Sequence, residues 1–152
     1  MAIREIESVY GAVLYRLINN SGRALSVGYI PNDSRGFFLV NEKVPLCIKY
    51  ATKKISPWVF TFTKKQQDDL QEVRDIYGSA VIVFVCGHDG VCAVRFDEFK
   101  EVLDYYHEEV ENVTVRRKRR EKYSVSGSDG ELKHKVGDNY FPKIIDEILG
   151  EI

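Results

Sequence analysis

The chain has 152 residues, of which 44% are hydrophobic and 30% charged, which suffices for one domain with a real core but not for two. Its formal net charge of -1 excludes a global field that draws the whole protein to nucleic acid, so any basic partner site must be local. Three cysteines without framework spacing, no apolar run near ~18 residues and no leader-like N-terminus predict a reduced cytoplasmic location and no membrane partner.

The first part of the chain predicts one helix followed by three strands. Apolar residues recur at spacings of three and four up to Leu17, which is typical of an amphipathic helix that covers a sheet. Short β-branched and aromatic runs then alternate with turn residues, and the last two runs predict an antiparallel pair. The predicted elements are a helix over 3–18 and strands over 23–30, 35–40 and 44–50.

Alternation in the third predicted strand separates two kinds of side chain. Leu46, Ile48 and Tyr50 fall on one face, and Cys47 and Lys49 fall on the other. Lys49 therefore leaves the strand from a half-buried position, where a lysine needs a partner or a function.

The second part predicts a helix, a buried hairpin and a mixed C-terminal segment. Trp58 to Thr63 is an alternating extended segment, and Thr63 and Gly78 are typical start and stop residues for a helix between them. The run 80–86 is apolar without alternation, as in a strand buried on both faces. Further predictions are a strand over 91–96, a helix from Asp97 through Tyr106, one long strand or a hairpin over 113–125, a turn over 126–130, a return strand over 131–136 and a helix that Pro142 opens.

This order of elements resembles the core of the PD-(D/E)XK nuclease superfamily, the restriction-endonuclease-like fold. The resemblance covers about 3–96 and implies an α/β fold with a mixed sheet and an αβββαβ core, extended by a C-terminal β-hairpin and helix over 97–152. We expect a single domain over 1–152. Gln66 or Gln67 matches the polar helix residue that some members of the family carry.

The resemblance also assigns the site residues. In the family, an acid on the second strand and an acid-x-lysine triplet on the third hold Mg²⁺. Lys49 matches the family lysine, whereas Cys47 stands where the triplet's acid belongs, and a thiol is a poor ligand for Mg²⁺. The second strand carries aromatic residues at the other acid's place, so the nearest carboxylates are Asp33 and Glu42. We therefore expect a dismantled metal site without metal or cofactor; Mg²⁺ is expected only if Asp33 or Glu42 acts with Lys49 in an active nuclease.

A dense cationic segment follows the predicted strand that begins at Val113. Arg117 and Arg119 continue the strand face of Val113 and Val115, so the segment is expected to leave the core. Consecutive cations in a protein of nearly zero net charge are a local footprint for phosphates. The predicted nucleic-acid-binding residues are Arg116, Arg117, Lys118, Arg119, Arg120 and Lys122.

Three functions stay open at this point. The favoured one is a catalytically silent nuclease-like domain that binds DNA or RNA or forms the non-catalytic part of a larger assembly. The second is an active Mg²⁺-dependent nuclease with a displaced acid. The third is a protein-interaction or homodimerisation module in which the cationic segment meets an acidic partner. The sequence thus leaves open whether the protein is an enzyme.

Overall fold

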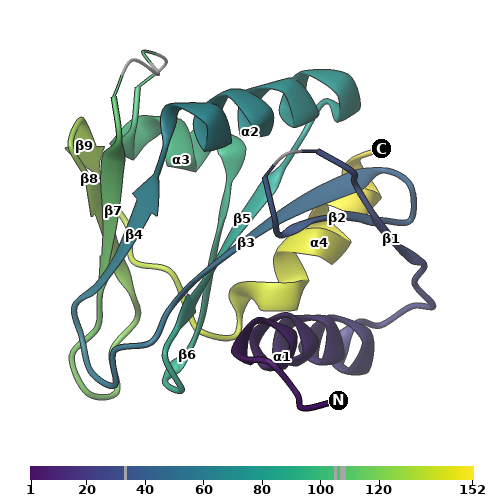
Figure 1. The fold of residues 1–152 in the computed structure, drawn as a ribbon, viewed down its shortest axis with the longest axis horizontal. Helices are drawn as coiled ribbons and strands as arrows, with labels where there is room; N and C mark the ends of the chain where they lie inside the picture. The colour runs from purple at the N-terminus through teal and green to yellow at the C-terminus, as the bar shows by residue number, and fades with distance from the viewer. Residues whose placement is uncertain (33, 105, 107–108) are drawn as a thin grey trace.

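The computed structural model describes residues 1–32, 34–104, 106 and 109–152, which form four helices and two β-sheets (Figure 1). The larger sheet has the order β1 (Val27–Tyr29), β2 (Phe37–Val40), β3 (Val44–Ala51), β5 (Val81–Cys86) and β6 (Gly90–Arg95). The smaller sheet has the order β4 (Trp58–Phe62), β7 (Glu111–Arg116), β8 (Ser124–Gly127) and β9 (Gly130–Glu131). The helices are α1 (Glu5–Asn20), α2 (Lys64–Tyr77), α3 (Phe96–Val102) and α4 (Tyr140–Glu151).

The larger sheet is covered on both faces. On one face, side chains of α1 and α4 pack with Leu46 and Ile48 of β3 and with alternate residues of β5. On the other face, α2, α3 and the smaller sheet pack with Cys47 and with the remaining residues of β5. Every residue of β5 is buried, which confirms the prediction that this strand has no solvent-facing side.

Aromatic rings join the two sheets at the centre of the molecule. The Phe84 ring from β5 lies 4.8 Å from the Phe60 ring and 6.2 Å from the Phe62 ring of β4. The Phe62 ring also lies 5.0 Å from that of Phe99 on α3. These rings fill the space between the sheets, as large aromatic side chains do in cores.

The prediction that the first three strands and the strand over 80–86 share one mixed sheet is confirmed. β1, β2 and β3 pair antiparallel, and β5 pairs parallel with β3. The helix predicted over 64–77 has the observed bounds, and the one predicted over 3–18 occupies Glu5–Asn20. The first strand is shorter than the predicted 23–30, because its pairing with β2 begins only at Val27. β4 does not belong to this sheet. It pairs with β7 in the smaller sheet, which the sequence pattern did not indicate.

Helix α3 is shorter than predicted, and its start differs. The prediction was a helix capped by Asp97 and extending through Tyr106, whereas the N-cap is Arg95 and the helix ends at Val102. The backbone N–H of Asp129, in the turn between β8 and β9, donates to the Val102 carbonyl at 2.9 Å. A Cβ on Gly130 would come within 2.4 Å of the Glu101 carbonyl oxygen. The β8–β9 hairpin therefore packs against the C-terminal end of α3.

The segment over 113–125 is a hairpin, one of the two predicted alternatives. β7 and β8 pair antiparallel, with Val113 opposite Gly127 and Arg116 opposite Ser124. The turn predicted over 126–130 falls at Ser128 and Asp129. Among the helices of the described chain, none is long and apolar enough to cross a membrane.

Candidate functional site

A pocket of about 440 Å³ opens around Lys49 on the larger sheet. Its walls come from α1, from the segment that precedes β2, from the end of β3 and from the first turn of α2. The polar side chains that line it include Tyr10, Ser34, Arg35, Lys49, Lys65 and Gln66.

Lys49 reaches the first turn of α2. Its ammonium Nζ donates to the Thr61 carbonyl oxygen at 2.6 Å and to Gln66 Oε1 at 3.2 Å. The same nitrogen lies 4.7 Å from the centre of the Phe62 ring. Burial lowers the pKa of Lys49 from its ordinary value. The structure thus gives this lysine the partners that its half-buried place in the strand requires.

Gln66 has a second role at the start of α2. Its side-chain oxygen accepts from the Thr63 backbone N–H, while the Thr63 hydroxyl accepts from the Gln66 backbone N–H. This reciprocal pair is a capping box. Of the two glutamines that the family resemblance left open, Gln66 is therefore the one that contacts Lys49, whereas Gln67 is buried and donates to the Phe62 carbonyl.

Cys47 is buried in the core and does not offer a metal ligand. The side chain is buried, 4% exposed, in the core between the two sheets. Burial raises the pKa of the Cys47 thiol to about 12, so the group is a neutral thiol at physiological pH. Phe37 pairs opposite it on β2 and is also buried. Neither strand position supplies a carboxylate for a divalent cation.

A buried carboxylate that the sequence analysis missed lies beneath the pocket. Asp69 on α2 is 3% exposed. One carboxylate oxygen accepts from the Ser34 hydroxyl, and the other lies 2.7 Å from the ammonium of Lys65. Asp69 shares the buried face of α2 with Leu70 and Val73, and this position was visible as a carboxylate within the apolar stripe.

The pocket is lined by cations. Arg35, Lys49 and Lys65 contribute three positive side chains, and none of its described lining residues carries a carboxylate. Asp69 offsets one of these charges from below, through its ion pair with Lys65. Such a wall favours an anion over a divalent cation.

Of the two acids proposed for a displaced metal site, only Glu42 belongs to the described residues, and it lies far from Lys49. Glu42 lies exposed in the turn between β2 and β3, with a positive φ of 58°. It precedes Lys49 by seven residues at the opposite end of β3, or roughly 20 Å of extended chain. Asp33 lies outside the described residues.

The predicted cationic segment connects β7 to β8, and we call residues 116–122 the cationic turn. Arg116, Lys118, Arg119, Arg120 and Lys122 are exposed, and Arg120 adopts a φ of 65° at the tip. None of these five has an ion pair among the described contacts. The turn therefore presents unneutralised positive charge to solvent.

Arg117 departs from the expectation that the whole segment leaves the core. Its side chain is 15% exposed and forms ion pairs of 2.7 Å with both Asp89 and Asp138. Its guanidinium lies 4.5 Å from the centre of the Tyr123 ring. The Tyr123 hydroxyl also donates to Asp89, at 2.8 Å. Arg117 is thus bound within the protein and is not displayed for phosphate.

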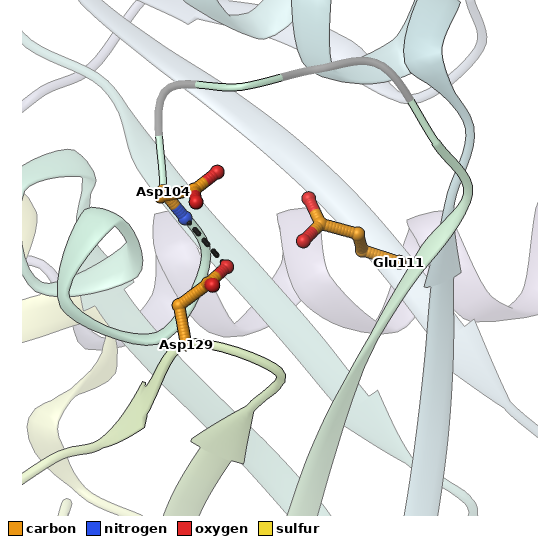
Figure 2. A group of neighbouring side chains, drawn as sticks. All are labelled: Asp104, Glu111 and Asp129. Atoms are coloured by element: carbon orange, nitrogen blue, oxygen red, sulfur yellow. Dashed lines mark hydrogen bonds between the residues drawn. The ribbon is translucent and has the colours of Figure 1, made fainter.

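Three acidic side chains gather at the other end of the smaller sheet (Figure 2). Asp104, Glu111 and Asp129 bring carboxylate oxygens within 4.8 Å of one another. Asp129 accepts from the Asp104 backbone N–H at 3.0 Å, and Glu111 accepts from the Ser128 hydroxyl at 2.8 Å. Burial, followed by the neighbouring Asp129 and Asp104, raises the pKa of Glu111. These acids satisfy local hydrogen bonds and carry mutual repulsion.

The raised pKa of Glu111 predicts a pH-dependent effect of its substitution. Because the folded-state pKa lies above the unfolded value, ionisation of Glu111 destabilises the fold as pH rises through and above that range. Glu111→Gln should therefore raise the thermal midpoint at pH 7 and leave it unchanged at a pH where the carboxyl is already protonated. Thermal melts across this pH range measure the effect, and Glu131→Gln on β9 of the same sheet is the control. An equal shift at both pH values would contradict the prediction.

Comparison of the chain with models of known families, with curated proteins and with solved structures finds no match in any of the three.

Proposed function

We propose that this protein is a non-catalytic, metal-independent nucleic-acid-binding domain with a nuclease-like core. The resemblance to the PD-(D/E)XK superfamily belongs to the proposal. It is supported by the order β1-β2-β3-β5 and by the parallel pairing of β3 with β5 across the segment that contains α2. It is also supported by Lys49, which lies two residues beyond Cys47 on β3 and donates a hydrogen bond to Gln66 of α2.

One observation carries the functional part of the proposal. The pocket around Lys49 displays Arg35, Lys49 and Lys65, and its described lining holds no carboxylate. Cleavage of a phosphodiester by Mg²⁺ requires oxygen ligands for the ion and a metal-activated water. The same wall of cations without the ion still attracts a phosphate group, because its charge is opposite. The cationic turn adds further positive charge for a phosphate backbone.

The direct test compares cleavage with binding. In Mg²⁺ or Mn²⁺, the protein should cut plasmid, single-stranded DNA and RNA no faster than a Lys49→Met variant. In excess EDTA, the wild type should still bind labelled DNA or RNA, and Lys49→Met should bind it less tightly. Methionine is chosen because its stem keeps the packing against Phe62 while the charge is removed.

Two outcomes would contradict the proposal. Metal-dependent cleavage that disappears in Lys49→Met and in Asp33→Asn would identify an active nuclease with a displaced acid. Absence of any salt-dependent binding to nucleic acid would favour the protein-interaction module instead. Lys43→Met, which removes an exposed lysine from the β2–β3 turn, is the matched control for loss of charge.

A further inference from the structure

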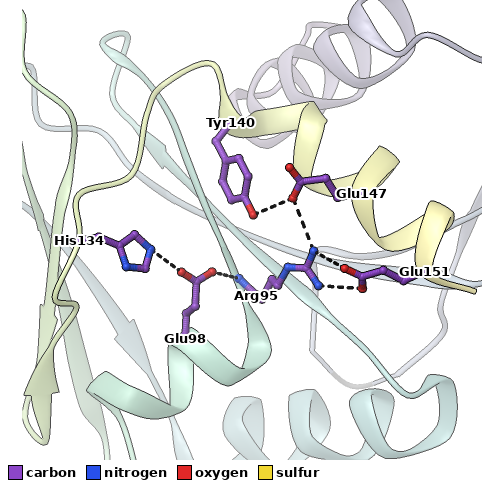
Figure 3. A network of polar contacts seen from close by, with 6 residues as sticks. All are labelled: Arg95, Glu98, His134, Tyr140, Glu147 and Glu151. Atoms are coloured by element: carbon purple, nitrogen blue, oxygen red, sulfur yellow. Dashed lines mark hydrogen bonds and ion pairs between the residues drawn. The ribbon is translucent and has the colours of Figure 1, made fainter.

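A second cation-lined groove lies beside α4, outside the nuclease-like core. It has a volume of about 370 Å³, and its polar lining includes Lys122, His134, Lys135, Tyr140, Lys143 and Glu147. Figure 3 places His134 on the segment after β9, and Tyr140 and Glu147 on α4, across from it. The groove therefore separates two elements that the sequence analysis assigned to no function.

The groove is continuous with the cationic turn. Lys122 belongs both to the turn and to the groove wall. The ammonium of Lys135 pairs with Glu121 of the turn at 3.0 Å, and the backbone of Tyr123 bridges to that of Val136. Arg117 also pairs with Asp138. These contacts fix the segment after β9 against the turn, so the two sets of cations form one surface.

The charge balance of this surface is strongly positive. Nine lysines and arginines and four acidic residues lie between residues 116 and 143, in a chain with a net charge of -1. Two of these four acids, and Glu147 on the groove wall, form ion pairs within the protein. Glu121 pairs with Lys135, Asp138 with Arg117, and Glu147 with Arg95 at 3.5 Å. In the described structure, Lys122 and Lys143 are left without an ion-pair partner.

The polar contacts at the groove hold its walls in place. The carboxylate of Glu98 accepts from the Arg95 backbone N–H and contacts His134 Nε2 at 3.0 Å (Figure 3). The guanidinium of Arg95 makes two 3.0 Å contacts with Glu151 at the end of α4. The Tyr140 hydroxyl donates to Glu147 at 3.1 Å. The groove is thus built by side chains that join β6, α3 and α4.

The geometry points to this surface, from the cationic turn across the groove to Lys143, as the track along which a nucleic-acid phosphate backbone binds. The inference rests on the proposed function and adds to it a location, the groove that begins at Lys122, and the residues Lys135 and Lys143. A protein partner is disfavoured because protein interfaces are anchored by large apolar or aromatic side chains. In the described chain from 111 to 151, no large apolar side chain is among the exposed ones. Cations without apolar anchors fit phosphates.

The test uses the full chain, fluorescein-labelled duplex DNA, the matching single strand and the same sequence as RNA. Lys122→Ala/Lys143→Ala should reduce the magnitude of the slope of log affinity against log salt for duplex DNA by about 1.8, because two phosphate contacts are lost. Affinity at ~0.1 M salt should fall between about 10-fold and about 60-fold. The control Arg16→Ala/Lys43→Ala removes the same charge from exposed positions on α1 and the β2–β3 turn and should bind like the wild type.

The possible results separate this inference from the function on which it rests. Unchanged binding by the Lys122/Lys143 variant, with a salt-dependent wild type, would overturn the track and leave nucleic-acid binding intact. A wild type that binds none of the three probes would overturn the proposed function as well. Binding of labelled poly-glutamate with equal or higher affinity would assign the surface to an acidic protein. Thermal melts of every variant test whether a loss of binding reflects loss of folding. The melting temperatures should stay unchanged, because the substituted lysines are exposed or line the groove.

Discussion

Replacement of Arg116, Lys118, Arg119 and Arg120 by alanine should nearly abolish binding to nucleic acid and leave the fold intact. If each cation contacts one phosphate, the slope of log affinity against log salt flattens by about 3.6, and affinity at ~0.1 M salt falls about a thousandfold. The thermal midpoint should hardly change, because all four side chains are exposed and substitutions at such sites usually cost within about 0.5 kcal/mol.

Arg117→Ala is the informative contrast within the same turn. Its side chain is 15% exposed, pairs with both Asp89 and Asp138 and lies over the Tyr123 ring. Loss of hydrogen bonds to charged groups at a largely buried site should lower the free energy of unfolding by about 2 kcal/mol. Anisotropy titrations and thermal melts on both variants measure the two effects. A quadruple variant that binds like the wild type, or an Arg117→Ala variant of unchanged stability, would contradict this division of roles.

Phe84→Ala should have the largest effect on stability. Phe84 is fully buried on β5, and its ring contacts Phe60 and Phe62 of the other sheet. Truncation of a buried phenylalanine removes apolar contact and leaves a cavity, at a cost of about 3–5 kcal/mol in the free energy of unfolding. Because the ring lies between the two sheets, the cavity has walls in both and cannot close by movement of one side chain.

Denaturant unfolding of Phe84→Ala and of the wild type measures this loss. Tyr29→Ala is the control, because the same kind of ring is removed at a site that is 60% exposed on the edge strand β1. Its effect should stay below about 1 kcal/mol. A Phe84→Ala variant that loses no more stability than Tyr29→Ala would show that the contact between the sheets is not held by these rings.

The order of helices and strands along the chain was accessible to sequence reasoning, because each element carried a local signal. The alternation through Cys47 and Lys49 assigned the faces of β3, and Thr63 and Gly78 marked the ends of α2. The departure of β4 to a second sheet was not accessible, since Trp58–Phe62 alternates in the same way whichever strand it pairs with. Pairing partners distant in sequence leave no trace in a local pattern.

The candidate site was predictable only where a local sequence pattern marks one of its residues. Lys49 was found because a half-buried lysine in a strand violates the apolar pattern. Its pocket partners Arg35 and Lys65 come from separate elements, and only the tertiary fold brings them together. Arg117 was misjudged because its compensating acids, Asp89 and Asp138, lie 28 and 21 residues away in the chain. Charge density in the sequence does not distinguish a displayed arginine from a paired one.

The path of the chain between the sheets has a consequence for how the protein unfolds. The chain enters the smaller sheet at β4, returns to the larger one for β5 and β6, crosses again for β7 to β9, and ends with α4 on the larger sheet (Figure 1). Neither sheet is a continuous stretch of sequence, so a fragment ending before Glu111 would leave β4 without its neighbour β7. Because the chain alternates between the sheets, unfolding of one sheet would also remove the packing partners of the other. Unfolding should therefore be one cooperative transition, with no separately stable half.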